Sequence, residues 1–170
     1  MRLRNILAAA AAATLVPLAA QAADMAVADL VGPDGQAMGD VTLTEEPNGI
    51  LVQVRAAGLT AGAHGFHIHE TGACAPDFGA AGDHYNPAGS GHGFLHEGGL
   101  HAGDLPNIHA DATGGANADF FTDAVTLAEG ADNTLFDADG SAIIIHENPD
   151  SYGADAGAGG RVACGVIERR

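Results

Sequence analysis

Apolar residues in this chain alternate with a period of two, and this pattern restricts the fold more than any other feature of the sequence. Ile50, Val52 and Val54, for example, would share one face of a strand, because successive side chains of a strand point to opposite faces. No comparable stretch repeats with a helical period, and turn signals separate the apolar runs. The pattern predicts about eight strands, at residues 25–31, 37–45, 49–57, 62–70, 107–111, 116–123, 141–146 and 161–168.

Short strands with frequent turns indicate an all-β sandwich or barrel, and residues 23–170 have the length of one domain. Three longer connections are expected at 71–106, 124–140 and 147–160. The first carries four of the nine histidines. A loop of that length inside a compact domain is normally functional or disordered. A metal ion and a disulfide at Cys74 would be two ways to order it.

The N-terminus has the features of a secretory signal. Arg2 and Arg4 precede an apolar run at residues 6–20, and the small residues Ala20 and Ala22 flank Gln21. This pattern predicts a signal peptide over residues 1–22, cleaved after Ala22 or Ala23, rather than a membrane anchor. We therefore expect the mature domain, residues 23–170, to be periplasmic or secreted. No later segment is long and apolar enough to span a bilayer.

The two cysteines and the charge agree with that expectation. In an oxidising compartment Cys74 and Cys164 are interpreted first as a disulfide, the alternative being two free buried thiols. Removing Arg2 and Arg4 leaves four basic residues against 22 acidic ones, a net charge of −18, and there is no lysine. Such a surface repels nucleic acid and anionic membranes, so neither is expected as a partner.

Seven residues have the types and spacing of a metal site. His67 and His69 lie two residues apart on a predicted strand and would point to the same side. Imidazole and carboxylate groups suit zinc and copper. Two four-coordinate ions need eight bonds, so one histidine that binds through both ring nitrogens would complete the count, although a five-plus-two division stays open. The other five residues are His84, His92, His101, Asp104 and His146.

Five segments, in this order, resemble the copper–zinc superoxide dismutase family, and the signal and the glycine-rich loop resemble its bacterial exported branch. They are HGFHIHE at 64–70, GDHYNP at 82–87, HAGDL at 101–105, HENPD at 146–150 and GRVACGVI at 160–167. The resemblance implies a flattened eight-stranded Greek-key barrel, an immunoglobulin-like sandwich with long metal-binding and active-site loops. It also implies one copper ion and one zinc ion per chain.

The resemblance assigns roles residue by residue. Cys74 and Cys164 would form the family's disulfide, and Arg161 would sit beside the open copper position and attract the anionic substrate. Asp150 would link a copper histidine to a zinc histidine. The copper ligands would be His67, His69, His84 and His146, and the zinc ligands would be His84, His92, His101 and Asp104.

The implied activity is the dismutation of superoxide to dioxygen and hydrogen peroxide by a copper redox cycle. His84, released from copper on reduction, would take up a proton and donate it as a general acid. Zinc has no redox chemistry and would fix the loop. Family members often carry lysines near the copper channel, whereas this chain has none, so Arg161 is expected to provide most of the local positive field.

Two other function classes remain to be tested. One is an exported copper- and zinc-binding module without turnover, and the other is a β-sandwich interaction domain, which would leave the seven ligand-type residues unexplained. The sequence leaves the choice between monomer and homodimer open. Of the remaining histidines, His64 is expected to be structural, and His96 and His109 are expected to be surface residues.

Overall fold

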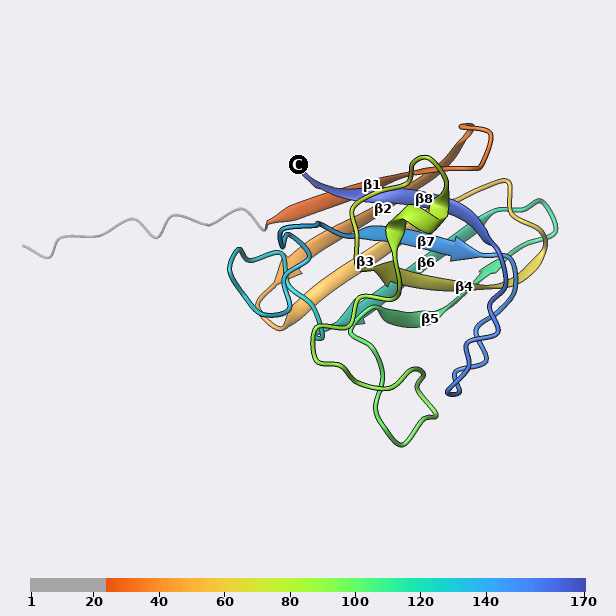
Figure 1. The fold of residues 1–170 in the computed structure, drawn as a ribbon. Helices are drawn as coiled ribbons and strands as arrows, with labels where there is room; N and C mark the ends of the chain where they lie inside the picture. The colour runs from red at the N-terminus through yellow and green to blue at the C-terminus, as the bar shows by residue number, and fades with distance from the viewer. Residues whose placement is uncertain (1–23) are drawn as a thin grey trace, which may run out of the picture.

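Eight antiparallel strands run through the computed structural model, which describes residues 24–170, and they wrap into a nearly closed barrel (Figure 1). The expected signal peptide at residues 1–22 lies outside the described residues. Seven of the eight predicted strands are confirmed to within one residue at each end. The strands are β1 Met25–Val31, β2 Ala37–Glu46, β3 Gly49–Ala56, β4 Gly62–His69, β5 Asp104–Ala110, β6 Ala116–Thr122, β7 Ala142–His146 and β8 Arg161–Arg169.

The start of β5 differs from the prediction, because the strand begins at Asp104 and not at residue 107. Proline removes a backbone donor and is unusual inside a central strand, yet β5 includes Pro106. Strand β5 stands at one end of the strand order and pairs only with β4. A proline is tolerated on such an edge. The longer strand places Asp104 beside His67 of β4, so a proposed zinc ligand is part of the sheet.

The strand order is β5-β4-β7-β8-β1-β2-β3-β6, so the connections β3–β4 and β6–β7 cross from one side of the sheet to the other. This is the Greek-key arrangement, and it confirms the expected all-β barrel. The two end strands, β5 and β6, are joined by the short turn at 111–115. Inside the barrel, the rings of Phe66 on β4 and Phe120 on β6 stack with their centroids 5.7 Å apart.

Strand β7 departs from the alternating pattern, since all five of its residues are buried. Ile143 and Ile145 face the main core, whereas Ala142 and Ile144 belong to a second apolar cluster with Ala81. That second cluster underlies the β4–β5 loop, which contains the short 3₁₀ helix η1, Phe78–Ala81. β7 is therefore covered by the barrel on one face and by the loop on the other.

A disulfide between Cys74 and Cys164 ties the β4–β5 loop to β8, as expected from the two cysteines. Its Cα atoms lie 5.9 Å apart. In Figure 1 the long loop, yellow-green to green, first carries η1 across β8 and then extends below β5. Within residues 24–170, no helix has the length and apolar character needed to cross a membrane.

Candidate metal centre

Four histidines from three separate segments meet beside the barrel. His67 and His69 come from β4, His146 ends β7, and His84 belongs to the β4–β5 loop, where its backbone bridges to His69. The ring centroids of His67 and His84 are 4.0 Å apart, and those of His67 and His146 are 5.0 Å apart. Each of the four offers one ligand atom, and these atoms all lie within 4.8 Å of one another.

In three of these histidines, one ring nitrogen is held by the protein and the other is free. His67 Nε2 lies 2.7 Å from a carboxylate oxygen of Asp150, His69 Nδ1 donates to the carbonyl oxygen of Gly82 at 2.9 Å, and His146 Nδ1 faces the carbonyl oxygen of Gly159 at 3.4 Å. Within the described part of the chain, the opposite nitrogens are buried without a hydrogen-bond partner. Buried polar atoms are normally paired, so three converging free nitrogens fit a metal ion.

Burial also sets the protonation of these imidazoles. It lowers the pKa of His69 to about 2 and that of His146 to about 4. It lowers the pKa of His67 as well, although the hydrogen bond with Asp150 opposes the shift. All three rings are therefore neutral at neutral pH. The neutral imidazole is the form that binds a metal ion.

Asp104 brings His92 and His101 together in a second cluster on the other side of His84. Its Oδ1 atom lies 2.7 Å from His84 Nδ1 and 3.6 Å from His92 Nε2. His101 Nδ1 is 3.3 Å from the same oxygen, without hydrogen-bond geometry. His84, His92 and Asp104 form the compact group, and the His101 ring lies 5.5 Å from that of His84. All seven predicted residues are thus brought together around His84.

The Asp104 carboxylate is built into this second cluster. Its Oδ2 atom accepts hydrogen bonds from the backbone N–H groups of Gly93, at 2.9 Å, and His101, at 3.0 Å. Burial by itself would raise the pKa of Asp104, but the hydrogen bonds from His84 and from these two N–H groups outweigh it and lower the pKa. Asp104 is therefore an ionised carboxylate, which is the state that binds zinc.

Asp150 connects the two clusters. Its Oδ2 atom lies 2.7 Å from His67 Nε2 and 3.1 Å from His92 Nε2. The carboxylate thus touches one residue of each cluster. Burial would raise the pKa of Asp150, but the hydrogen bond from His67 and the one from the backbone of Tyr152 lower it.

Arg161, the first residue of β8, is the cationic side chain at the site. Its two terminal guanidinium nitrogens donate to the carbonyl oxygens of Phe78 and Gly82, both at 2.6 Å. Since Gly82 also accepts from His69, one carbonyl group orients both the arginine and a histidine of the first cluster. The disulfide at Cys74 anchors the loop that carries Phe78 and Gly82.

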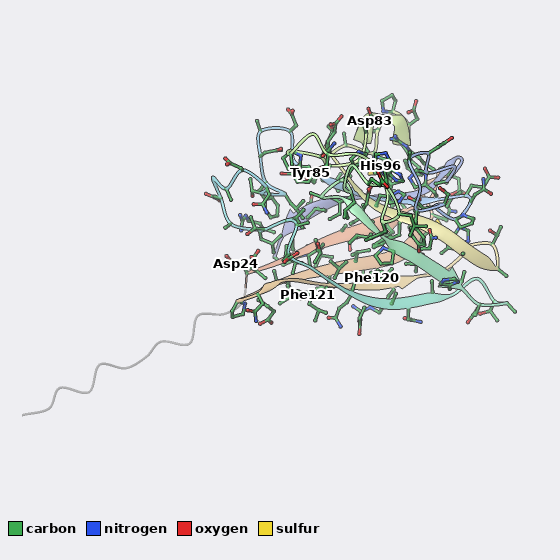
Figure 2. All side chains as sticks on the ribbon, turned by 90° about the horizontal axis from the view of Figure 1, so that it is seen from below. Asp24, Asp83, Tyr85, His96, Phe120 and Phe121 are labelled. Carbon is green, nitrogen blue, oxygen red and sulfur yellow. A yellow bond between two sulfur atoms is a disulfide. The ribbon has the colours of Figure 1, made fainter. Side chains whose placement is uncertain are left out.

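The other three histidines lie outside the two clusters. His64 is buried, and its ring nitrogens contact the carbonyl oxygens of His146, at 2.7 Å, and Thr60, at 2.8 Å, as expected of a structural histidine. His96 and His109 are exposed. In Figure 2, His96 lies with Asp83 and Tyr85, the neighbours of His84, on the upper side of the view, while Phe121 of β6 lies below.

Sequence reasoning missed the groups that act through the backbone or through neutral side chains. The carbonyl groups of Phe78 and Gly82 were not expected to take part. Nor were the side chain of Asn107, which donates to the carbonyl oxygen of Asp150, and the backbone N–H of Tyr152, which donates to the Asp150 carboxylate. A backbone carbonyl has no side-chain signature. Asn107 lies only three residues after Asp104, which is the one signal that could have singled it out.

Comparison with known proteins gives a consistent result. The sequence model of the copper/zinc superoxide dismutase (SODC) family matches residues 37–167. A Cu–Zn superoxide dismutase of Caulobacter vibrioides is 46% identical over 140 residues, covering 79% of this chain and 80% of the relative. Cu–Zn superoxide dismutase 2 of Aquifex aeolicus is 43% identical over 144 residues, covering 82% and 84%.

Solved structures agree with these relatives. The crystal structure of a double mutant of a SOD-like protein from Bacillus subtilis superimposes with a TM-score of 0.79 at 39% sequence identity. The match covers 82% of this chain and 95% of that chain. The similarity therefore extends over nearly the whole of the neighbouring barrel.

Proposed function

The chain belongs to the copper/zinc superoxide dismutase family, and we infer from this membership that it catalyses the dismutation of superoxide to dioxygen and hydrogen peroxide. Its cofactors are one copper ion and one zinc ion. The observation that carries this function is the set of buried, unpaired nitrogens of His67, His69 and His146 beside Arg161, since an ion at that point would satisfy all three.

We propose that the first cluster holds copper and that the second holds zinc. His84 belongs to both, because its Nδ1 atom faces Asp104 and leaves Nε2 for the first cluster. When bound, copper supplies one-electron redox chemistry, and zinc supplies a fixed charge without redox chemistry. The copper ligands are His67, His69, His84 and His146, and the zinc ligands are His84, His92, His101 and Asp104.

We assign substrate binding to Arg161 and proton delivery to His84. The guanidinium group is permanently charged and offers five N–H donors in a fixed fork, and its contacts with Phe78 and Gly82 hold that fork in place. A small anion is thus attracted and oriented. His84 Nε2, when it carries a proton, is placed to act as a general acid toward the product.

We also propose that residues 1–22 are a signal peptide, cleaved after Ala22 or Ala23, and that the mature domain, residues 23–170, is periplasmic or secreted. The Cys74–Cys164 disulfide supports export, because disulfides persist mainly in oxidising compartments. The N-terminal sequence of the protein recovered from its native host tests the cleavage site, and its recovery from the periplasmic fraction or the medium tests the location.

The competing function is a metal-binding module without turnover. The variant His146→Ala separates the two, because His146 lies in the first cluster and is absent from the second. We expect it to lose copper-dependent dismutation while zinc content, measured by elemental analysis, stays near one ion per chain. If wild-type protein with both metals bound showed no copper-dependent dismutation, the storage function would be correct.

A further inference from the structure

Tyr152 binds the second oxygen of the Asp150 carboxylate, although the proposed function gives Tyr152 no role. Oδ2 of Asp150 contacts His67 and His92, and Oδ1 accepts a hydrogen bond from the backbone N–H of Tyr152 at 2.7 Å. Both oxygens are therefore fixed, one by the two histidines and one by Tyr152. A carboxylate with both oxygens held cannot rotate away from the rings it orients.

The backbone of Tyr152 has an unusual conformation, with φ at 63°. Residues other than glycine avoid this left-handed region, so the surrounding structure must hold it. The carbonyl oxygen of Tyr152 accepts from the N–H of Leu95 at 2.8 Å. Its ring packs edge-on against Phe94, with centroids 5.4 Å apart. Phe94 and Leu95 closely follow His92, so Tyr152 also anchors the loop of the second cluster.

Asn107 on β5 fixes the same unit from the other side. Its side-chain amide donates to the carbonyl oxygen of Asp150 at 2.9 Å and accepts from the N–H of Asp150 at 2.8 Å. The N–H of Asn107 donates to the phenol oxygen of Tyr152 at 2.8 Å. Asp150 is thus held by its backbone through Asn107 and by its carboxylate through Tyr152, and the two supports contact each other.

We propose that Tyr152, supported by Asn107, is a positioning residue that holds the Asp150 carboxylate against His67 and His92 and thereby sets the zinc affinity of the site. The inference rests on the proposed assignment of His92 to zinc. It depends on the phenol oxygen and ring of Tyr152, because these keep its backbone N–H aimed at Asp150. Residues outside the ligand shell commonly change metal affinity by about 10- to 100-fold.

The test is a zinc titration of metal-free protein against a chromogenic zinc chelator, with no copper present. Tyr152→Ala should weaken zinc binding roughly 10- to 100-fold. Tyr152→Phe, which removes only the hydroxyl acceptor for Asn107, should weaken it less. Asn107→Ala, which removes the side-chain contacts with the backbone of Asp150, should also weaken zinc binding. Its matched control is Asn133→Ala, because the half-buried Asn133 amide donates instead to the carbonyl oxygen of Ala124 at 3.0 Å. The control should bind zinc like the wild type.

A double-mutant cycle with Asp150→Asn shows whether Tyr152 acts through Asp150. In that background Tyr152→Ala should lower zinc affinity little further, since the effects of coupled residues do not add. Fully additive effects, or wild-type affinity in Tyr152→Ala, would overturn the proposal. If Tyr152→Ala does not fold, Tyr152→Phe serves in the same cycle. Failure of the wild type to bind zinc would instead refute the proposed ligand assignment.

Discussion

Three imidazoles of the first cluster, those of His67, His69 and His146, each have one nitrogen held by the protein and one left free. His69 shows this most simply: Nδ1 donates to the carbonyl oxygen of Gly82, and Nε2 is left buried and free. The hydrogen bond fixes both the tautomer and the direction of the ring. The free nitrogens are therefore placed before any ion arrives, and ligand reorganisation on metal binding is small.

Arg161→Ala should reduce catalysis without emptying the metal sites, because Arg161 contacts backbone carbonyls rather than the ligand nitrogens. Losing a hydrogen bond to a charged group costs about 1.5–3 kcal/mol, which corresponds to a fall in kcat/KM of roughly 10- to 100-fold. The kcat/KM of Arg161→Lys should lie between those of Arg161→Ala and the wild type, since lysine keeps the positive charge but lacks the planar fork of donors.

The measurement is the second-order rate of superoxide decay at matched copper and zinc content. Wild-type kcat/KM in Arg161→Ala would show that the arginine does not bind substrate. A loss of copper would show that it supports the ligands.

Single residues were predictable from the sequence where their side chains carry the chemistry. The seven ligand-type residues stand out by type and spacing, and a shared strand face places His67 beside His69. Asn107 was not predictable, because it contacts the backbone of Asp150 in a loop 43 residues away. Tyr152 was not predictable either, because its backbone N–H, and not its side chain, donates to the Asp150 carboxylate. The carbonyl groups of Phe78 and Gly82 have no sequence signal at all.

At the scale of elements, the barrel supplies the rigid half of the site and the β4–β5 loop supplies the other half. His67, His69 and His146 stand on strands whose apolar neighbours are fully buried. The loop holds few large buried side chains, and Phe94, Leu95 and Leu100 are 45%, 78% and 39% exposed. The disulfide and the metal cluster are therefore its main anchors.

Replacing both cysteines, Cys74→Ser with Cys164→Ser, should lower the free energy of unfolding by about 4 to 5 kcal/mol in the chain-entropy account. The large value follows from the sequence separation of 90 residues. The measurement is urea denaturation of the metal-free protein, with the reduced wild type for comparison. An unchanged midpoint would mean that the bridge adds no stability and only positions the loop beside Arg161.

Removing both ions with a chelator should loosen residues 84–103 while the strands stay folded. The reason is that this segment is held by His84, His92 and Asp104 more than by apolar burial, and weakly packed segments open first. Amide hydrogen exchange should rise in the loop and stay slow in β1, β2 and β3. Equal protection of the loop with and without metals would show that the apolar contacts alone order it.

Strand positions were predictable because alternation marks them, and the error at β5 has a specific cause. The strand includes Pro106, which the position of β5 at the end of the strand order tolerates. Strand order is a long-range property that a local pattern does not contain. The sequence contains the continuous apolar run Ala142–Ile145 of β7, but it does not show which elements cover the two faces of that strand.

The molecule as a whole is strongly acidic, with a net charge of −16, and it should therefore repel an anionic substrate. Three of the four arginines in residues 24–170 pair with carboxylates, Arg55 with Asp40, Arg169 with Glu129 and Arg170 with Asp29. Arg161 instead donates to backbone carbonyls. Its positive charge is therefore not offset by a carboxylate and acts at the site.

The rate of dismutation should stay level or rise as ionic strength increases to about 0.15 M, where charges more than about 8 Å apart are largely screened. Salt weakens the general repulsion from the acidic surface while the short-range attraction of Arg161 persists. The measurement is the superoxide decay rate over a sodium chloride series at fixed pH. A steep fall with salt would reveal long-range positive steering and contradict this account.

We propose that a copper ion held by His67, His69, His84 and His146 performs the dismutation. The most direct test is the decay of superoxide, generated by pulse radiolysis, in samples loaded with zero to one copper ion per chain at constant zinc. We predict a rate constant proportional to bound copper, with the His146→Ala protein close to the uncatalysed rate. Fully copper-loaded wild-type protein that removed superoxide no faster than buffer would contradict the claim.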